Sequence, residues 1–251
     1  MTATNNIIGT PLIEMNVTES TNNYAMQLVN NGSGAHGMAV FAHGQTGGKG
    51  QYGRKWTGNA GENIALSVII ETKHLHLPAQ FALNASISLA VYDFFSFYAG
   101  DETSVKWPND IYWRDRKAGG ILIENQVTGK EWQWAIAGIG LNINQSAFEN
   151  GLGKAVSLKQ ITGKQYMPLQ LAAELCAYLE KRYRQFLNTD INDVFAAYNK
   201  ILYKKNESVK LKKENAVFDC IIKGVNNQGQ LEILRAGIDE TFNAGEVQWV
   251  I

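Results

Sequence analysis

Hydrophobic and polar positions follow a helical period near the start of the chain. The apolar side chains of residues 18–32 fall on one face, Ser20 and Thr21 can cap the start, and Asn31 with Gly32 can end the segment. This pattern predicts a short helix.

Strand-like runs and a long apolar helix follow. Residues 37–43 and 63–72 are rich in aliphatic and β-branched side chains, which is typical of strands, and a glycine-rich stretch separates them. Residues 78–100 are apolar nearly all round a helical wheel. Such a helix is expected to pack against a sheet rather than to lie half in solvent.

The rest of the chain adds short strands, two helices and a second group of strands. Turn residues join the strand-like runs 104–107, 111–113, 119–127 and 131–144, so we expect antiparallel pairing. Two helical segments cover 168–187 and 191–202, and four short strand-like pieces separated by polar turns complete the chain. We therefore predict an α+β domain over residues 1–204 and a small β-barrel over residues 205–251.

Composition narrows the class of protein. Of 251 residues, 45% are hydrophobic, and 23 basic side chains balance 23 acidic ones. A net charge of zero argues against a protein that holds nucleic acid or an anionic membrane by bulk electrostatics, so any bound anion must be met by local charges. We find no leader-like start and no long apolar run, and we expect a cytoplasmic protein.

The cysteines and histidines predict little chemistry. Cys176 lies in a helical pattern and Cys220 in a strand pattern, which leaves no disulfide framework, and we expect both to be buried thiols. The four histidines lack the spacing of a metal site. No metal site built from protein side chains is expected.

Residues 48–53 spell GKGQYG, a match to the dinucleotide-binding motif GxGxxG. That motif requires the third glycine to open a helix, whereas this stretch leads into a predicted strand. A glycine-rich loop between strands that carries Lys49, Arg54 and Lys55 is better suited to wrap a small anion with backbone N–H groups and positive charge. A flexible, solvated hairpin is the alternative for this segment alone.

A second group of residues runs from Lys106 to Asp110 and continues to Lys117. Pro108 fixes its own φ and restricts the residue before it, so this turn is expected to be stiff. Gly119-Gly120 within a strand pattern predicts a bulge or a close approach of backbone to a ligand. Lys117 alone reads as an exposed strand-end lysine, but together these features favour a phosphate site.

The three motifs occur together in one known family. The segments GQTGGKGQYGRKWTGNAGENIALS, VKWPNDIYWRDRKAGGILIE and AIAGIGLNIN, in this order, resemble the biotin protein ligases, and Ser20-Thr21-Asn22 matches the short motif near the start of that family. The resemblance covers about residues 13–251. It implies a catalytic domain like that of class II synthetases, with a mixed, largely antiparallel sheet, followed by a barrel of Src-homology type.

The resemblance also implies an activity and its substrates. Biotin's carboxylate attacks the α-phosphate of ATP to give biotinyl-5'-AMP, and a lysine of a biotin carboxyl carrier domain of a biotin-dependent carboxylase then takes the biotinyl group. Mg²⁺ is expected on the ATP phosphates. The implied catalytic residues are Lys117 and Lys49. The implied biotin-binding residues are Ser20, Thr21, Asn22, Gln45, Gly48, Lys49, Gly50, Gln51, Lys117 and Gly120. The implied nucleotide-binding residues are Arg54, Trp56, Lys106, Asn109 and Asn142.

This sequence departs from the family pattern in two ways. The family's loop commonly reads GRGRRGR, and Gln51 and Tyr52 stand here where two arginines are usual. Some relatives also carry an N-terminal helix-turn-helix domain, but here the motifs begin almost at once, so we expect no specific DNA binding and no membrane association. The sequence leaves open whether the chain forms a homodimer.

Three other functions compete with this interpretation. A lipoate-protein ligase or related acyl transferase of the same fold would need a long apolar tunnel and no polar residues for a ureido ring. A protein that only sequesters biotin would release no pyrophosphate from ATP. A nicotinamide-dependent oxidoreductase, suggested by GxGxxG alone, lacks the helix which that motif must open.

Overall fold

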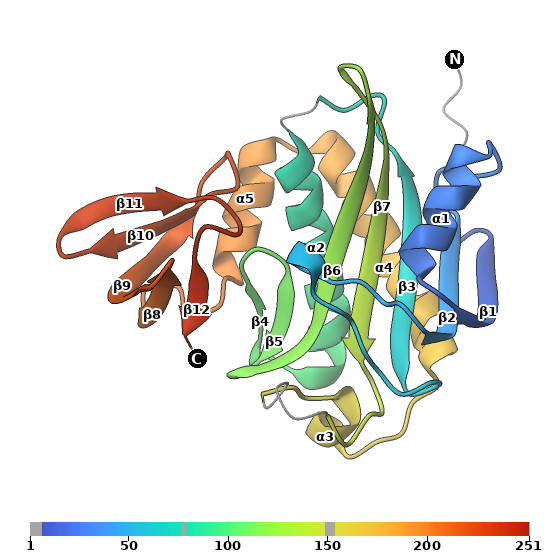
Figure 1. Ribbon diagram of the computed structural model, residues 1–251, viewed down its shortest axis with the longest axis horizontal. Helices are drawn as coiled ribbons and strands as arrows, with labels where there is room; N and C mark the ends of the chain where they lie inside the picture. The colour runs from blue at the N-terminus through green and yellow to red at the C-terminus, as the bar shows by residue number, and fades with distance from the viewer. Residues whose placement is uncertain (1–6, 77–78, 149–153, 251) are drawn as a thin grey trace.

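The computed structural model describes residues 7–76, 79–148 and 154–250, and it contains two sheets with helices packed around the larger one (Figure 1). The larger sheet has seven strands in the order β1-β2-β3-β7-β6-β5-β4. Its strands are β1 (Leu12–Thr18), β2 (Ala39–Gln45), β3 (Asn63–Glu71), β4 (Thr103–Lys106), β5 (Asp110–Trp113), β6 (Arg116–Thr128) and β7 (Glu131–Asn142). The first two strands are parallel and the other neighbours antiparallel, which confirms the predicted mixed, largely antiparallel sheet.

Three helices lie on one side of this sheet: two contact its strands, and the third packs against the central helix. They are α2 (Gln80–Ala99), α4 (Pro168–Asn188) and α5 (Ile191–Lys200). The central helix α2 packs against both α4 and α5 and lies behind the sheet in Figure 1, which explains its almost uniformly apolar sequence. Its buried Phe94 and Phe95 join the main hydrophobic core together with Leu66, Val68 and Leu175. Cys176 and Cys220 are both buried and unpaired, as predicted.

The opposite face of the sheet is covered only in part. Helix α1 (Thr21–Asn30) is capped by Ser20, and it packs Ala25 and Val29 onto a small second core that includes Ile69 and Ile136. Beyond that core, the registers place small side chains opposite one another across three strands. Ser67 pairs with Gly138, Ala65 pairs with Gly140, and Gly140 pairs with Gly120. Directly paired residues share a face, so this part of the face is floored by small residues.

The C-terminal sheet is antiparallel and has the strand order β11-β10-β9-β8-β12. Its strands are β8 (Ser208–Lys213), β9 (Ala216–Val225), β10 (Leu231–Arg235), β11 (Ile238–Phe242) and β12 (Gln248–Val250). It docks beside α5 and the β4–β5 turn, where Trp107 Nε1 donates to the carbonyl of Gly229 at 3.0 Å and Asn199 Nδ2 donates to the carbonyl of Val225 at 2.8 Å. The predicted second β region is thus confirmed as a sheet, and its closure into a barrel stays a prediction.

Some elements were not predicted from the sequence. Strand β1 is the half-exposed edge strand of the large sheet, α3 (Leu158–Thr162) is a single short helix, and β11 is a mostly exposed strand. In the part of the chain that the structure describes, none of the helices combines the length and the apolar character needed to cross a bilayer.

Candidate active site

The turn between β4 and β5 is fixed to the neighbouring strand β6. The Asn109 side chain donates to the carbonyl of Ile121, and the backbone N–H of Ile121 donates back to the carbonyl of Asn109 at 3.0 Å. A bulge follows, because Ile111 pairs with Gly119 whereas Tyr112 pairs with Lys117. The turn predicted from the sequence is present, and of the two alternatives predicted from Gly119-Gly120, the bulge is confirmed.

Lys117 lies beside a carboxylate on the floor of this region. Its Nζ is 2.6 Å from Oδ1 of Asp110, and a Cβ on Gly120 would lie 3.5 Å from the same Nζ. The Lys117 carbonyl accepts from Asn142 Nδ2 at 3.4 Å and from the backbone N–H of Val156 at 2.9 Å. The Lys117 side chain is partly exposed. Two hydrogen bonds to its carbonyl hold the backbone in place.

Lys106 belongs to the same cluster of charges. Its Nζ donates to the hydroxyl of Tyr112 at 3.0 Å. The pKa of Lys106 is lowered to about 8, mainly by burial; the carboxylate of Asp110 opposes this shift, and the positive charges of Lys117, Arg54 and Lys154 add to it. Three other cations and one carboxylate thus lie close enough to Lys106 to affect its charge. Such a surplus of positive charge suits an anion that carries several negative charges.

A buried polar network occupies the other end of the small-residue face. Oγ of Ser67 lies 2.6 Å from Oδ1 of Asn22 and 2.7 Å from Oγ1 of Thr21, and the backbone N–H of Thr21 donates to Gln45 Oε1 at 2.8 Å. Asn22 Nδ2 donates to Glu124 Oε2 at 2.8 Å. The structure therefore brings together Thr21, Asn22 and Gln45, as predicted. Ser20 is also buried, and its hydroxyl caps α1 by accepting from the N–H of Asn23 at 3.4 Å.

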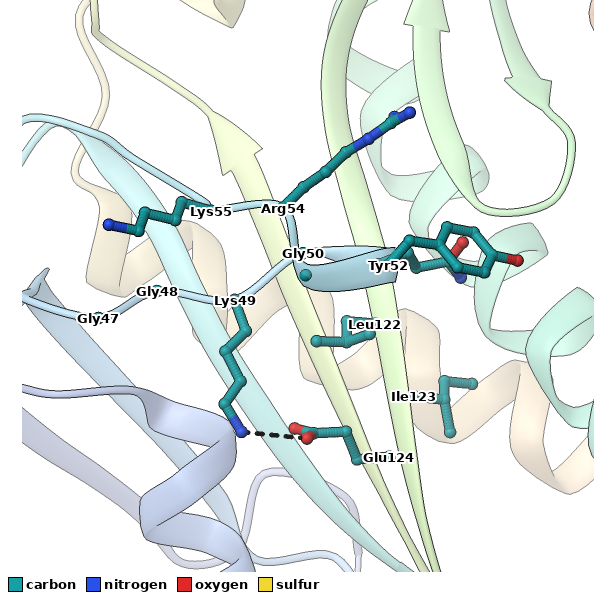
Figure 2. Close-up of a pocket in the computed structure, with 12 residues that line it drawn as sticks. Gly47, Gly48, Lys49, Gly50, Tyr52, Arg54, Lys55, Leu122, Ile123 and Glu124 are labelled. Atoms are coloured by element: carbon teal, nitrogen blue, oxygen red, sulfur yellow. Dashed lines mark hydrogen bonds and ion pairs between the residues drawn. The ribbon is translucent and has the colours of Figure 1, made fainter. Parts of the chain in front are cut away.

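The glycine-rich loop crosses the face between these two regions. Together with Leu122, Ile123 and Glu124 of β6, residues 47–55 line a cavity of about 610 Å³. Figure 2 shows Lys49 pointing towards Glu124, 3.2 Å from Nζ to Oε1, while Arg54 and Lys55 point away from this pair. Gly48, Gly50 and Gln51 line the same cavity. The loop contains one short 3₁₀ turn (Gln51–Gly53) and leads into β3, so the dinucleotide-binding interpretation is excluded.

Glycines allow the loop and α1 to approach the sheet closely. A Cβ on Gly140 would lie 2.5 Å from the indole ring of Trp56, and a Cβ on Gly138 would lie 2.8 Å from Cγ of Asn22. Separations under about 3 Å are far inside van der Waals contact, so neither position accepts a side chain unless its neighbour moves. Glycine at both positions lets Trp56 and Asn22 lie directly on β7.

Sequence reasoning assigned no role to several residues of this site. Asp110 stands inside the Lys106–Lys117 motif, but only the bulge shows that it faces Lys117. Glu124 follows Gly120 and Leu122 at alternate positions of one strand, so the three side chains share a face. A charged residue on the same face as Gly120 could have indicated that Glu124 belongs to the site. Ser67 lies in an apolar strand, and nothing local indicates that it meets Thr21 and Asn22.

Comparisons with known proteins agree with this geometry. The family model described as the Biotin/lipoate A/B protein ligase family matches residues 14–142. The chain is 29% identical over 243 residues to the Bifunctional ligase/repressor BirA of Bacillus spizizenii, which covers 95% of this chain and 74% of that protein. It is 30% identical over 238 residues to the Biotin--[acetyl-CoA-carboxylase] ligase of Paracoccus denitrificans, which covers 92% and 97%.

A solved structure shows the same fold. The biotin protein ligase from Aquifex aeolicus in complex with biotin and ATP matches with a TM-score of 0.79 at 24% identity, and the match covers 94% of this chain and 97% of that one. The chain belongs to the biotin/lipoate A/B protein ligase family. Within that family, the Paracoccus denitrificans relative and the Aquifex aeolicus structure are biotin ligases, which confirms the resemblance found in the motifs.

Proposed function

We propose that this protein activates biotin with ATP to biotinyl-5'-AMP and transfers the biotinyl group to one lysine of a biotin carboxyl carrier domain. One observation carries the proposal. Lys106 and Lys117 lie beside Asp110 at one end of a small-residue sheet face, and Arg54 and Lys154 are near enough to lower the pKa of Lys106; at the other end lies a buried network of hydroxyl and amide groups that is hydrogen-bonded to Glu124. This arrangement matches a substrate pair in which a charged polyphosphate meets the carboxylate of a largely uncharged acid.

The polar network suits the head group of biotin. A ureido ring offers two N–H donors and one carbonyl acceptor, and a buried site must match each of them. Thr21, Asn22, Gln45 and Ser67 supply hydroxyl and amide groups of both kinds within one connected network. Ser20 supports this network by capping α1, so we assign it a positioning role.

The chemistry requires charge neutralisation and orientation. An oxygen of the biotin carboxylate forms a bond to the α-phosphorus while the bond to pyrophosphate breaks, and both partners are negatively charged. The Lys117 ammonium, held beside Asp110 and above Gly120, is placed to reduce this repulsion. In the second step the acceptor amine attacks the acyl carbon and AMP leaves. Neither step needs a nucleophilic side chain from the protein.

The remaining site residues are assigned around the nucleotide and the loop. Arg54 and Lys106 are placed to meet phosphate charge, and Trp56 lies where its ring packs on Gly140. Asn109 and Asn142 direct their amide donors to backbone carbonyls, so we propose that they hold the strand carrying Lys117. Gly48, Lys49, Gly50 and Gln51 form the wall that closes over biotin and the adenylate.

Mg²⁺ fits this site as a phosphate-bound ion. Among the described residues no cluster of His, Cys, Asp or Glu side chains could hold a metal ion alone, and Asp110 is paired with Lys117. Mg²⁺ commonly binds through substrate phosphates with few protein ligands, and there it withdraws negative charge from them.

The domain division is part of the proposal. Helix α5 ends at Lys200 and β8 begins at Ser208, which supports a catalytic domain over 1–204 and a small domain of Src-homology type over 205–251. Biotin carboxyl carrier domains are the acceptor class that the relatives' activity implies. The cytoplasmic location stays a prediction.

Biotin-dependent exchange of labelled pyrophosphate into ATP tests the proposed activity directly. Exchange is expected with biotin and not with lipoic or octanoic acid, because the acid-binding end of the face is polar. Exchange supported by lipoic or octanoic acid but not by biotin would instead indicate a lipoate-type ligase.

The pH dependence of ATP use is expected to report Lys106. Because the pKa of Lys106 is about 8 in the ligand-free protein, the ammonium is present below pH 8 and is lost as the pH rises. The ratio kcat/KM for ATP should therefore fall by up to about tenfold between pH 7 and pH 9. Lys106→Arg keeps its charge over this range and should remove the alkaline fall. An unchanged profile in Lys106→Arg would assign the titration to another group.

Gln51→Arg is expected to slow the release of trapped biotinyl-AMP by about fivefold. An arginine would give the loop a charge-assisted contact that the glutamine amide lacks, and such contacts are roughly twice as strong. Release of labelled intermediate after gel filtration measures the effect. Lys49→Ala should release it faster, although this change also removes the cation paired with Glu124. Equal release rates in wild type and Gln51→Arg would show that position 51 does not govern retention.

A further inference from the structure

The last strand of the C-terminal sheet reaches the cation cluster of the other sheet. Strand β12 pairs with β8, where Trp249 lies opposite Leu211. From this position the Trp249 ring centroid lies 5.3 Å from Lys106 Nζ, and the Tyr112 ring lies 4.8 Å from the same atom. Tyr203 completes the group, 5.0 Å from Tyr112 and 5.7 Å from Trp249 between ring centroids. Lys106 is thus flanked by aromatic rings contributed from both sheets.

The hydrogen bonding of Trp249 differs from that of three other indoles in the protein. The indole N–H groups of Trp107, Trp113 and Trp132 each donate to an oxygen at 3.0–3.1 Å. Trp249 Nε1 is buried and has no hydrogen-bond partner in the described part of the chain. A buried unpaired donor is unfavourable. Packing and the contact between its ring and Lys106 therefore fix the position of Trp249, although its N–H remains without a hydrogen bond.

A neighbouring turn reinforces the contact between the two sheets. A Cβ on Gly245, which lies between β11 and β12, would be 2.9 Å from the Tyr52 ring. Tyr52 belongs to the glycine-rich loop, so the segment that ends in Trp249 contacts both the loop and Lys106. Neither Tyr52 nor Trp249 belongs to the residues assigned to substrate binding above.

We propose that Trp249 is a positioning residue of the nucleotide site, which holds the Lys106 ammonium beside Tyr112 so that it meets the ATP phosphates. Lysine carries its charge on a flexible chain, and Asp110, already paired with Lys117, is the nearby carboxylate that competes for it. Aromatic faces attract a cation electrostatically, so they can hold the ammonium without that ion pair. This inference rests on the proposed use of ATP and adds the C-terminal strand to the site.

The effect of removing the ring follows from the size of a cation–π contact. Trp249→Leu is expected to weaken ATP binding by about 2- to 30-fold, the range from exposed to desolvated contacts. Trp249→Phe keeps an aromatic face and should stay closer to the wild type. In a Lys106→Met background, Trp249→Leu should have no further effect, because the group on which Trp249 acts is gone.

A double-mutant cycle on ATP affinity tests the proposal. Titration calorimetry with Mg-ATP would be run without biotin on wild type, Trp249→Leu, Trp249→Phe, Lys106→Met and the double variant Lys106→Met/Trp249→Leu. Phe218→Leu is the matched control, because Phe218 is an aromatic residue of the same C-terminal sheet whose ring contacts Arg235 at 4.2 Å. Thermal melting of each variant separates loss of folding from loss of affinity.

Each outcome bears on the proposal. Weakened binding in Trp249→Leu, near-normal binding in Trp249→Phe and Phe218→Leu, and no added loss in the double variant would support it. Unchanged binding in Trp249→Leu, or losses that add in the double variant, would overturn it. A wild type that binds ATP but shows no biotin-dependent exchange would contradict the proposed activity, and the mutant cycle would still decide the role of Trp249. A wild type that does not bind ATP would contradict both proposals.

Discussion

Lys117→Met is expected to slow the formation of biotinyl-AMP by about 10²- to 10³-fold, the usual effect of removing one preorganised contact to charge in a transition state. Methionine keeps most of the side-chain volume, and Lys117 is half-exposed, so the free energy of unfolding should change by less than about 1 kcal/mol. Single-turnover quench measurements of labelled adenylate give the rate. Chemical unfolding of the same preparation gives the stability.

Two controls isolate the charge at position 117. Arg116→Met removes the neighbouring cation on β6, which donates instead to the carbonyl of Ala155, and should leave adenylation near the wild-type rate. Lys117→Met also leaves the carboxylate of Asp110 without its partner, and the double variant with Asp110→Asn removes that carboxylate. Adenylation at the wild-type rate in Lys117→Met would show that its ammonium does not act on the reacting groups.

Gly138→Ala is expected to reduce biotin-dependent activity by roughly 10²-fold, mainly through a raised KM for biotin. The added methyl group would lie 2.8 Å from Cγ of Asn22, so Asn22 must move away from Ser67 and Glu124. A displacement of about 1 Å in a positioning group can have an effect of this size. Steady-state exchange measured at varied biotin and saturating ATP separates KM from kcat.

A matched glycine on the same sheet provides the control. A Cβ on Gly44 of β2 would make only ordinary contacts, 3.4 Å or more from its neighbours, so Gly44→Ala should be tolerated. If Gly138→Ala and Gly44→Ala have the same KM for biotin, the network of Asn22 and Ser67 is not part of the biotin site.

Local pattern predicted most of the elements and missed those that depend on pairing. The long helix α2 and the buried strand β3 have strong periods and clear ends. Strand β1 is a half-exposed edge strand whose parallel partner, β2, begins more than twenty residues later, and β11 consists mostly of exposed polar residues. Helix α3 could have been predicted from the sequence, because Ser157 and Gln160 form a capping box at its start.

In the site, too, local patterns in the sequence predicted some residues and missed others. The motifs containing Lys49, Lys106 and Lys117 were visible because each combines cations with turn or glycine residues. Glu124, which pairs with Lys49, and Trp249, which contacts Lys106, were not visible, because they lie 75 and 143 positions away and meet these lysines only through strand pairing and the docking of the two sheets. Contacts between distant segments are set by tertiary structure, which a local pattern does not encode.

Transfer of biotin to an acceptor domain tests the central claim most directly. The purified chain would be incubated with biotin, Mg-ATP and a biotin carboxyl carrier domain, and the acceptor followed by intact-mass spectrometry and peptide mapping, with the acceptor's target lysine changed to arginine as the control. The proposed function predicts one biotinyl group on one lysine, dependent on ATP, with one AMP and one pyrophosphate released per transfer. An acceptor that stays unmodified while ATP and biotin are present, or one that is modified equally well without ATP, would contradict it.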